Sequence, residues 1–129
     1  MVYIGNDIIE IERIRHFVLR HKEGCLGRVF TEKEWHYCWN KFNPFPSLAT
    51  RFAAKEAVAK AFGTGIGQAL KWTSVEILVD SLGCPFVQLD TLGQKFMHER
   101  SIKSISISLS HCRTYALATA CLVKSESIF

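Results

Sequence analysis

The residue types best suited to chemistry are concentrated in residues 51–60, RFAAKEAVAK. On a helix that turns about 100° per residue, Arg51 and Lys55 fall between large apolar side chains, so the segment lacks the separate polar face of an ordinary surface helix. Two like charges four residues apart are also mildly destabilising unless an anion lies between or beside them. The pattern therefore indicates a helix whose basic residues face an anion.

The same segment also has a purely structural interpretation. Glu56 and Lys60 stand four residues apart with the acid first, the order that stabilises an exposed helix by about 0.2–0.5 kcal/mol. Such a surface pair needs no ligand. It does not account for the missing polar face, and two features elsewhere in the chain favour the chemical interpretation.

The first feature is Asp7, which with Gly5 and Asn6 interrupts an otherwise hydrophobic strand expected over residues 2–9. An acid in such a break is either a turn residue that binds nearby backbone or a ligand held at the end of a strand. Mg²⁺ requires near-octahedral oxygen ligands, which two carboxylates, substrate phosphates and water together provide. Asp7 and Glu56 are the candidate pair of metal ligands.

The second feature is His111, which follows Ser110 at the end of a strand with strictly alternating serines. A lone histidine is more often a surface or hydrogen-bonded structural residue than a functional one. The chain has no Gly-x-Ser-x-Gly elbow, which argues against a serine hydrolase. From the residues alone, His111 stays open between a structural histidine and a functional one.

A glycine-rich run, GTGIG at residues 63–67, directly follows the charged helix. It precedes no strong helix, so it fits neither a dinucleotide-binding fingerprint nor a Walker loop. We expect Gly63 and Gly65 to end the helix and to let the backbone approach a ligand.

An α+β fold, with a mostly antiparallel sheet packed against helices, is expected to position these residues. Thr31 and Glu34 form a capping box, and apolar residues from Trp35 to Phe42 follow at the spacing of a core helix. Periodicity and turn residues predict the other elements. The expected helices cover residues 10–22, 32–42, 47–62 and 90–100, and the expected strands cover residues 2–9, 75–79, 86–89, 105–109 and 115–123.

Length and composition predict one compact domain over residues 1–129. Hydrophobic residues make up 48% of the chain and charged residues 22%, which excludes intrinsic disorder and low-complexity chains. The net charge of +4 is mild for a nucleic-acid-binding domain. It fits an anionic substrate or an acidic partner protein at least as well.

Cysteine usage and hydropathy indicate the compartment. The five cysteines include no Cys-x-x-Cys pair and match neither a zinc site nor a complete disulfide framework. Residues 1–12 contain three acids and no basic residue, unlike a signal peptide. The longest apolar stretch, residues 115–123, is too short to span a bilayer. We expect a soluble cytoplasmic protein without membrane attachment.

Residues 4–14 (IGNDIIEIERI), 28–34 (RVFTEKE) and 51–65 (RFAAKEAVAKAFGTG) resemble the motifs of the holo-(acyl-carrier-protein) synthases, the short 4′-phosphopantetheinyl transferases. Residues 72–85 and 107–111 extend the resemblance in weaker form, so it spans nearly the whole chain. The resemblance implies Mg²⁺-dependent transfer of the 4′-phosphopantetheine group from coenzyme A to a serine of apo-acyl carrier protein. Such enzymes release adenosine 3′,5′-bisphosphate and support fatty acid biosynthesis.

The resemblance also implies roles for individual residues. Asp7 and Glu56 match the Mg²⁺ ligands, and Lys60 matches the lysine beside the phosphates, so these three are the expected catalytic residues. Arg51 and His111 match groups that hold coenzyme A phosphates, with Arg51 acting across a subunit interface.

Three further expectations follow from the resemblance. Gly63 and Gly65 are placed with Lys60 in the coenzyme A site. Arg13 matches a basic position on the first helix that docks the acidic carrier protein. The resemblance implies active sites that lie between subunits of a trimer, so a homotrimer is expected.

Two other interpretations and one mechanistic question remain. A small RNA-binding module would use the positive charge, but Trp35 and Trp39 sit at core spacing and no basic run interleaves with them. An inactive relative that only oligomerises would not need Asp7, Glu56 and Lys60.

The identity of the general base is open between two candidates. It is either a metal-bound water or a carboxylate that acts through such a water.

Overall fold

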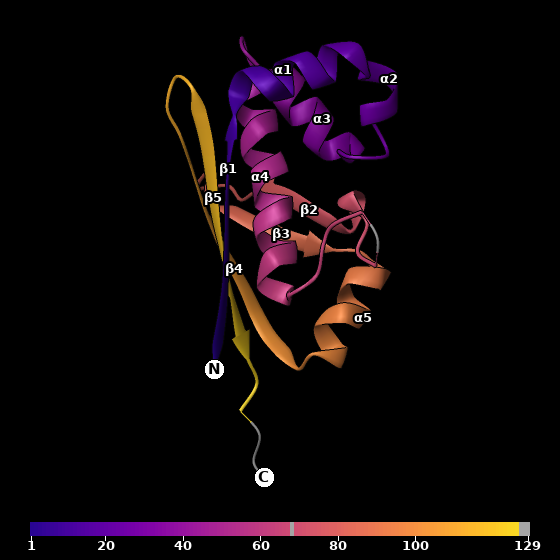
Figure 1. Ribbon diagram of the computed structural model, residues 1–129, viewed down its shortest axis with the longest axis vertical. Helices are drawn as coiled ribbons and strands as arrows, with labels where there is room; N and C mark the ends of the chain where they lie inside the picture. The colour runs from indigo at the N-terminus through magenta and orange to yellow at the C-terminus, as the bar shows by residue number, and fades with distance from the viewer. Residues whose placement is uncertain (68, 127–129) are drawn as a thin grey trace.

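The computed structural model describes residues 1–67 and 69–126 (Figure 1). A three-stranded antiparallel sheet has the order β1-β5-β4, and a separate hairpin pairs β2 with β3. The strands are β1 (Val2–Glu10), β2 (Val75–Val79), β3 (Pro85–Leu89), β4 (Ile102–His111) and β5 (Tyr115–Lys124). The helices are α1 (Ile11–Arg20), α2 (Lys22–Cys25), α3 (Glu32–Trp39), α4 (Phe45–Phe62) and α5 (Thr91–Glu99), with a short 3-10 helix, η1 (Trp72–Ser74).

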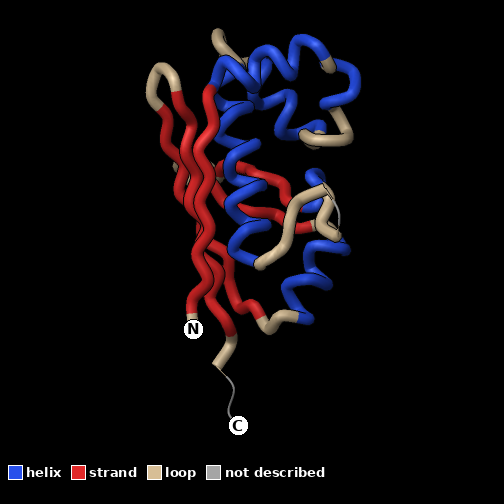
Figure 2. Tube along the Cα trace, viewed as in Figure 1, coloured by secondary structure: helices blue, strands red, loops and turns tan. Residues whose placement is uncertain are grey.

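The long helix α4 is the centre of the molecule. It lies along one face of the three-stranded sheet, while α1, α2 and α3 gather at one end and α5 lies toward the other (Figure 2). Small side chains allow this close packing, because Ala53, Ala57, Ala118 and Ala120 are all fully buried between α4 and the sheet. The α+β architecture predicted from the sequence is confirmed.

Strand β1 differs from the prediction in its middle. The expected break at residues 5–7 was wrong, because Gly5, Asn6 and Asp7 pair in unbroken register with residues 120, 119 and 118 of β5. Glycine, asparagine and aspartate are typical turn residues, but here they are held in extended conformation by pairing with the central strand β5. Asp7 is therefore a strand residue, and the interpretation of it as a turn residue was also wrong.

Helix α3 is shorter than predicted. Its capping box is present, with Thr31 and Glu34 each bonding the other's backbone, but the helix ends at Trp39. Phe42, which the helical spacing placed in the core, is fully exposed. Pro44 disfavours helical geometry at Asn43, and the chain reverses over residues 40–44 to begin α4 at Phe45.

Most other boundaries agree with the sequence. Helix α4 ends at Gly63, whose φ of 80° is left-handed and favours glycine. Asp90 caps α5 by accepting a hydrogen bond from the Gly93 amide. In β4 the serines face outward and Ile105, Ile107 and Leu109 are partly buried, as the alternation predicted. Within the described ranges 1–67 and 69–126, no helix is both long and apolar enough to cross a membrane.

Candidate functional site

The candidate site lies where β1 crosses α4, and Gly5 makes that crossing unusually close. A Cβ atom at Gly5 would lie 2.1 Å from the Ala57 carbonyl oxygen and 2.7 Å from the Ala61 nitrogen. Any larger residue would push the strand off the helix. Since side chains alternate along a strand, residue 7 faces α4 on the same side as Gly5.

Asp7 meets Lys60 of α4 at this crossing. The Lys60 Nζ donates to Asp7 Oδ1 and to the Asn6 carbonyl oxygen, both at 3.1 Å. The Asp7 side chain is 19% exposed, whereas that of Lys60 is 53% exposed. Two segments 53 residues apart in the chain therefore place a carboxylate and an ammonium together at a surface that a solute can reach.

Glu56 lies one turn before Lys60 on α4, and its environment is electrostatically unfavourable. Partial burial raises the pKa of Glu56, the negative charge of Asp7 raises it further, and the positive charge of Lys60 offsets part of the rise. Two carboxylates close enough to repel one another are a chemical fit for a divalent cation. The described residues contain no group of three or more His, Cys, Asp or Glu side chains suited to a metal.

Arg51 lies away from this pair. Arg51 is only 3% exposed. Its Nη1 donates to the Ser47 carbonyl oxygen at 3.2 Å, and its Cζ lies 4.5 Å from the centre of the Tyr37 ring. The Arg51 Nε is buried without a hydrogen-bond partner among the described residues. The structure thus does not bring Arg51 to Asp7 within one chain.

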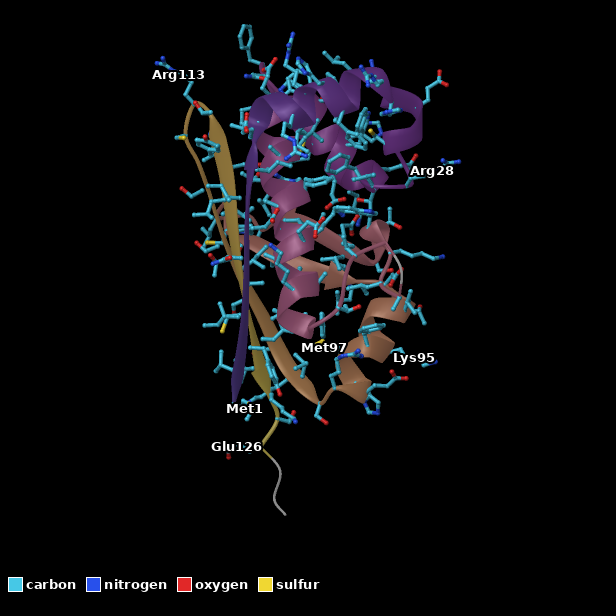
Figure 3. The ribbon with its side chains drawn as sticks, viewed as in Figure 1. Met1, Arg28, Lys95, Met97, Arg113 and Glu126 are labelled. Atoms are coloured by element: carbon cyan, nitrogen blue, oxygen red, sulfur yellow. The ribbon has the colours of Figure 1, made fainter. Side chains whose placement is uncertain are left out.

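His111 is also separate from Asp7 within one chain. It pairs with Ala116 of β5, which pairs in turn with Ile9 of β1. His111 is thus two strand spacings, or about 10 Å, from β1. It is exposed at the end of β4, directly before the β4–β5 turn, and Figure 3 shows Arg113 projecting outward from the hairpin tip.

The glycines and Arg13 lie at opposite ends of α4. Gly63 caps α4 three residues after Lys60, and a Cβ added at Gly63 or Gly65 would meet no other part of the described chain within 4 Å. Arg13 is exposed on α1, which packs near the start of α4 (Figure 1). A ligand bound at Lys60 would therefore lie beside the glycine loop. A macromolecule that binds Arg13 would do so toward the opposite end of α4.

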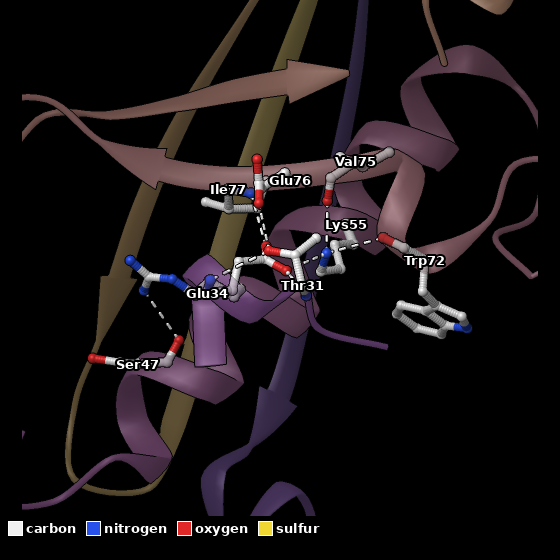
Figure 4. Close-up of polar contacts among 9 residues, drawn as sticks. Thr31, Glu34, Ser47, Lys55, Trp72, Val75, Glu76 and Ile77 are labelled. Carbon is white, nitrogen blue, oxygen red and sulfur yellow. Dashed lines mark hydrogen bonds and ion pairs between the residues drawn. The ribbon is translucent and has the colours of Figure 1, made fainter. Parts of the chain in front are cut away.

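Sequence reasoning missed one part of the site's support, the buried acid Glu34. Its Oε1 lies 2.8 Å from the Lys55 Nζ, and both side chains are fully buried (Figure 4). The signal was present in the sequence, because two basic residues on a helix without a polar face require an anion. For Lys55 that anion is a side chain of the same chain and not a ligand.

Comparison with known proteins adds independent findings. A model of the 4′-phosphopantetheinyl transferase superfamily matches residues 3–120. The chain is 48% identical to a holo-(acyl-carrier-protein) synthase of Chlamydia caviae, over 92% of this chain and 93% of that protein. It is 45% identical to the synthase of Ruminiclostridium cellulolyticum, over 96% of this chain and 93% of that protein.

Solved structures agree with these sequence matches. The crystal structure of the synthase from Neisseria meningitidis superposes with a TM-score of 0.88 at 34% identity, covering 96% of this chain and all of that one. The Helicobacter pylori synthase, crystallised in complex with coenzyme A, superposes with a TM-score of 0.82 at 33% identity, covering 93% of this chain and 99% of that one.

Proposed function

The chain belongs to the 4′-phosphopantetheinyl transferase superfamily, and we propose that it is a holo-(acyl-carrier-protein) synthase. In this reaction the 4′-phosphopantetheine group of coenzyme A is transferred to a serine of apo-acyl carrier protein, adenosine 3′,5′-bisphosphate is released, and the product serves fatty acid biosynthesis. The observation that carries the proposal is the contact of Asp7 with Lys60 at the β1–α4 crossing, with Glu56 one turn before Lys60 on α4 and within reach of the charge of Asp7.

Mg²⁺ is the proposed cofactor, with Asp7 and Glu56 as its protein ligands. The mutual repulsion of these carboxylates supports this assignment, since a cation between them would relieve it. When bound, Mg²⁺ supplies positive charge against the diphosphate of coenzyme A.

Lys60 is proposed to stabilise the phosphate oxygens during transfer. Its two hydrogen bonds, to Asp7 and to the Asn6 carbonyl oxygen, hold the ammonium at the crossing. An ammonium group has three N–H donors, so beyond these two bonds to the described part of the chain a third N–H can donate to a phosphate oxygen. A fixed ammonium aimed at developing negative charge accelerates phosphoryl transfer without reorganising in the transition state.

Arg51, His111, Gly63 and Gly65 are proposed to complete the coenzyme A site. The glycine loop adjoins Lys60, so its backbone can approach the nucleotide end of the substrate. His111 and Arg51 would act on a coenzyme A molecule bound between subunits, because neither reaches Asp7 within one chain. For Arg51 this requires the guanidinium to leave the Tyr37 ring that now covers it.

The acidic carrier protein is proposed to dock on α1 through Arg13. Arg13 is exposed there, and Arg15 and Arg20 on the same helix are also exposed. Positive charge on a docking surface speeds encounter with an acidic protein and makes that rate fall with salt.

A homotrimer in the cytoplasm is proposed for the assembled enzyme. The face of the three-stranded sheet that points away from α4 carries large exposed apolar residues: Ile4 is 68% exposed and Ile8 62%, with Tyr115 and Leu117 beside them on β5. Asn6 lies between the two isoleucines on β1, and the outward-facing serines of β4 border the other side of β5. Exposed apolar residues rimmed by polar ones are typical of a surface that another chain covers.

The decisive experiment incubates the purified protein with coenzyme A, Mg²⁺ and apo-acyl carrier protein. The intact mass of the carrier is expected to rise by one phosphopantetheine group, with adenosine 3′,5′-bisphosphate released in equal amount. Omitting coenzyme A or adding a chelator should prevent the change. An unchanged carrier mass under complete conditions, with a known synthase active in parallel, would overturn the proposal.

A further inference from the structure

The ammonium of Lys55 is fully buried and fully bonded. It lies 2.8 Å from Glu34 Oε1, 2.9 Å from the Trp72 carbonyl oxygen and 2.6 Å from the Val75 carbonyl oxygen. An ammonium group has three N–H donors, so all of them are used (Figure 4). These contacts tie α4 to α3, to η1 and to the start of β2.

Glu34 extends the same network into the helix cap and the hairpin. Its Oε1 accepts from the Thr31 amide at 2.9 Å, and its Oε2 accepts from the Ile77 amide at 2.8 Å. The Thr31 hydroxyl donates to Glu76 of β2. Residues of α3, α4, η1 and β2 therefore converge on one buried ion pair.

Stability alone gives little reason for this pair. The desolvation cost of burying two charges usually offsets their attraction, and apolar residues of similar volume are often equally stable at such positions. What an ion pair with directional hydrogen bonds adds is a fixed geometry, because each bond tolerates only a narrow range of angles.

The positions on α4 show which geometry is fixed. At about 100° per residue, Ala57, Lys60 and Ala61 lie on the side of α4 roughly opposite to Lys55. That opposite side is the one pressed against Gly5 of β1. Glu56 lies between the two sides, so any rotation of α4 about its axis moves Glu56 toward or away from Asp7.

We propose that Glu34 and Lys55 are positioning residues that fix the rotation of α4, so that Glu56 faces Asp7 at the separation one divalent cation requires. The inference rests on the proposed function, in which these two carboxylates hold Mg²⁺. A rotation of roughly 10° displaces a carboxylate about 5 Å from the helix axis by about 1 Å. Mg²⁺ demands near-ideal geometry at about 2.1 Å, so such a displacement weakens binding.

The test replaces the pair and measures Mg²⁺ binding directly. Lys55→Met breaks the ion pair between Lys55 and Glu34, but it leaves Glu34 as an uncompensated buried charge. The double variant Glu34→Gln/Lys55→Met avoids that charge and provides a folded protein if the single variant does not fold. Leu48→Ala is the matched control, because Leu48 is also fully buried on α4 but takes no part in the ion pair.

Mg²⁺ affinity is measured by calorimetry on each protein with coenzyme A present and no carrier protein. We expect Lys55→Met and the double variant to bind Mg²⁺ about 10–100-fold more weakly, the range found when residues that support metal ligands are replaced. The KM for Mg²⁺ in the transfer assay should rise by a similar factor, while the KM for coenzyme A changes little. Excess Mg²⁺ should restore most of kcat. Leu48→Ala should lower Tm without weakening Mg²⁺ binding.

Either of two results would overturn the positioning role: unchanged Mg²⁺ affinity in the folded double variant, or an equal loss of affinity in Leu48→Ala. Failure of the unsubstituted protein to modify the carrier would instead overturn the proposed function. The calorimetric comparison does not depend on transfer, so the two failures are distinguishable.

Discussion

Asp7 and Lys60 are joined by a 3.1 Å ion pair although 53 residues separate them in the chain. The pair exists because Gly5 lets β1 pack so close to α4 that a Cβ atom at residue 5 would lie 2.1 Å from the Ala57 carbonyl oxygen. The backbone contact and the polar contact are two residues apart on the same face of β1. Packing and electrostatics at the site therefore depend on the same crossing.

Replacing either proposed metal ligand should abolish transfer without unfolding the protein. Asp7→Asn and Glu56→Gln each remove one negative charge, and we expect kcat/KM to fall by at least roughly 100-fold. Intact-mass analysis of the carrier measures the rate, and thermal unfolding checks the fold. Glu32→Gln, at an exposed position on α3, makes the same chemical change away from the site and should keep full rate. Full activity in either site variant would disprove the metal assignment.

Glu56→Gln should also make the metal-free protein more stable at neutral pH. Burial and the charge of Asp7 raise the pKa of Glu56 above its ordinary value of 4.5, so the folded state binds this proton more tightly than the unfolded chain. The corresponding stabilisation is fully present below pH 4.5 and is lost as pH rises through the raised pKa. The Tm of Glu56→Gln should therefore exceed that of the unsubstituted protein at pH 7, and the difference should shrink toward pH 4. A difference that grows as pH falls would contradict this assignment.

The close approach at Gly5 predicts a specific loss of stability. In Gly5→Ala the new Cβ meets backbone atoms of α4, which cannot move aside as a flexible side chain could. We expect the free energy of unfolding to fall by about 1–3 kcal/mol, and transfer to be lost with it as Asp7 moves from Lys60. Gly24→Ala is the control, since its added Cβ would meet no other part of the described chain within 4 Å. Denaturant unfolding measures the free energy of unfolding of both variants. Equal free energies for Gly5→Ala and Gly24→Ala would refute the close contact.

Reversing the charge of Arg13 should weaken carrier docking and leave coenzyme A binding intact. Arg13→Glu is expected to raise the KM for the carrier roughly tenfold, which corresponds to about 1.4 kcal/mol. Lys95→Glu changes the net charge by the same amount on α5, toward the other end of the molecule (Figures 1 and 3), and should have little effect on that KM. Equal increases in the KM for carrier and for coenzyme A would argue against docking at α1.

The apolar outer face of the sheet predicts that oligomer formation is sensitive to charge there. Ile4→Lys places an ammonium among the exposed apolar residues of this face, and the proposed trimer should dissociate because burying an unpaired charge is costly. Light scattering during size-exclusion chromatography measures the mass. Leu82→Lys, at an 87% exposed turn position, should leave the mass unchanged. An intact trimer in Ile4→Lys would show that this face is not the interface.

Local sequence was sufficient for the elements whose signals are local. The capping box of Thr31 and Glu34, the glycine that ends α4 and the Asp90 cap of α5 were all predicted, because each depends on residues within one turn. Prediction failed where a distant segment decided the outcome. Gly5, Asn6 and Asp7 have turn chemistry but become strand because β5 offers them partners from more than 100 positions away. Phe42 is a local failure instead: it has core spacing but lies outside the core because α3 ends at Trp39 and Pro44 disfavours helical geometry at Asn43.

By itself, the sequence determined which residues are available for chemistry: an acid in the first strand, and an acid and a lysine on a helix without a polar face. It also indicated that Arg51 and Lys55 need an anion. Only the tertiary structure decided that Lys55 receives Glu34 as that anion, while Lys60 receives Asp7. The physical reason is that helical periodicity fixes the direction of each side chain but not what lies opposite it, which depends on how α3 and β1 pack on either side of α4.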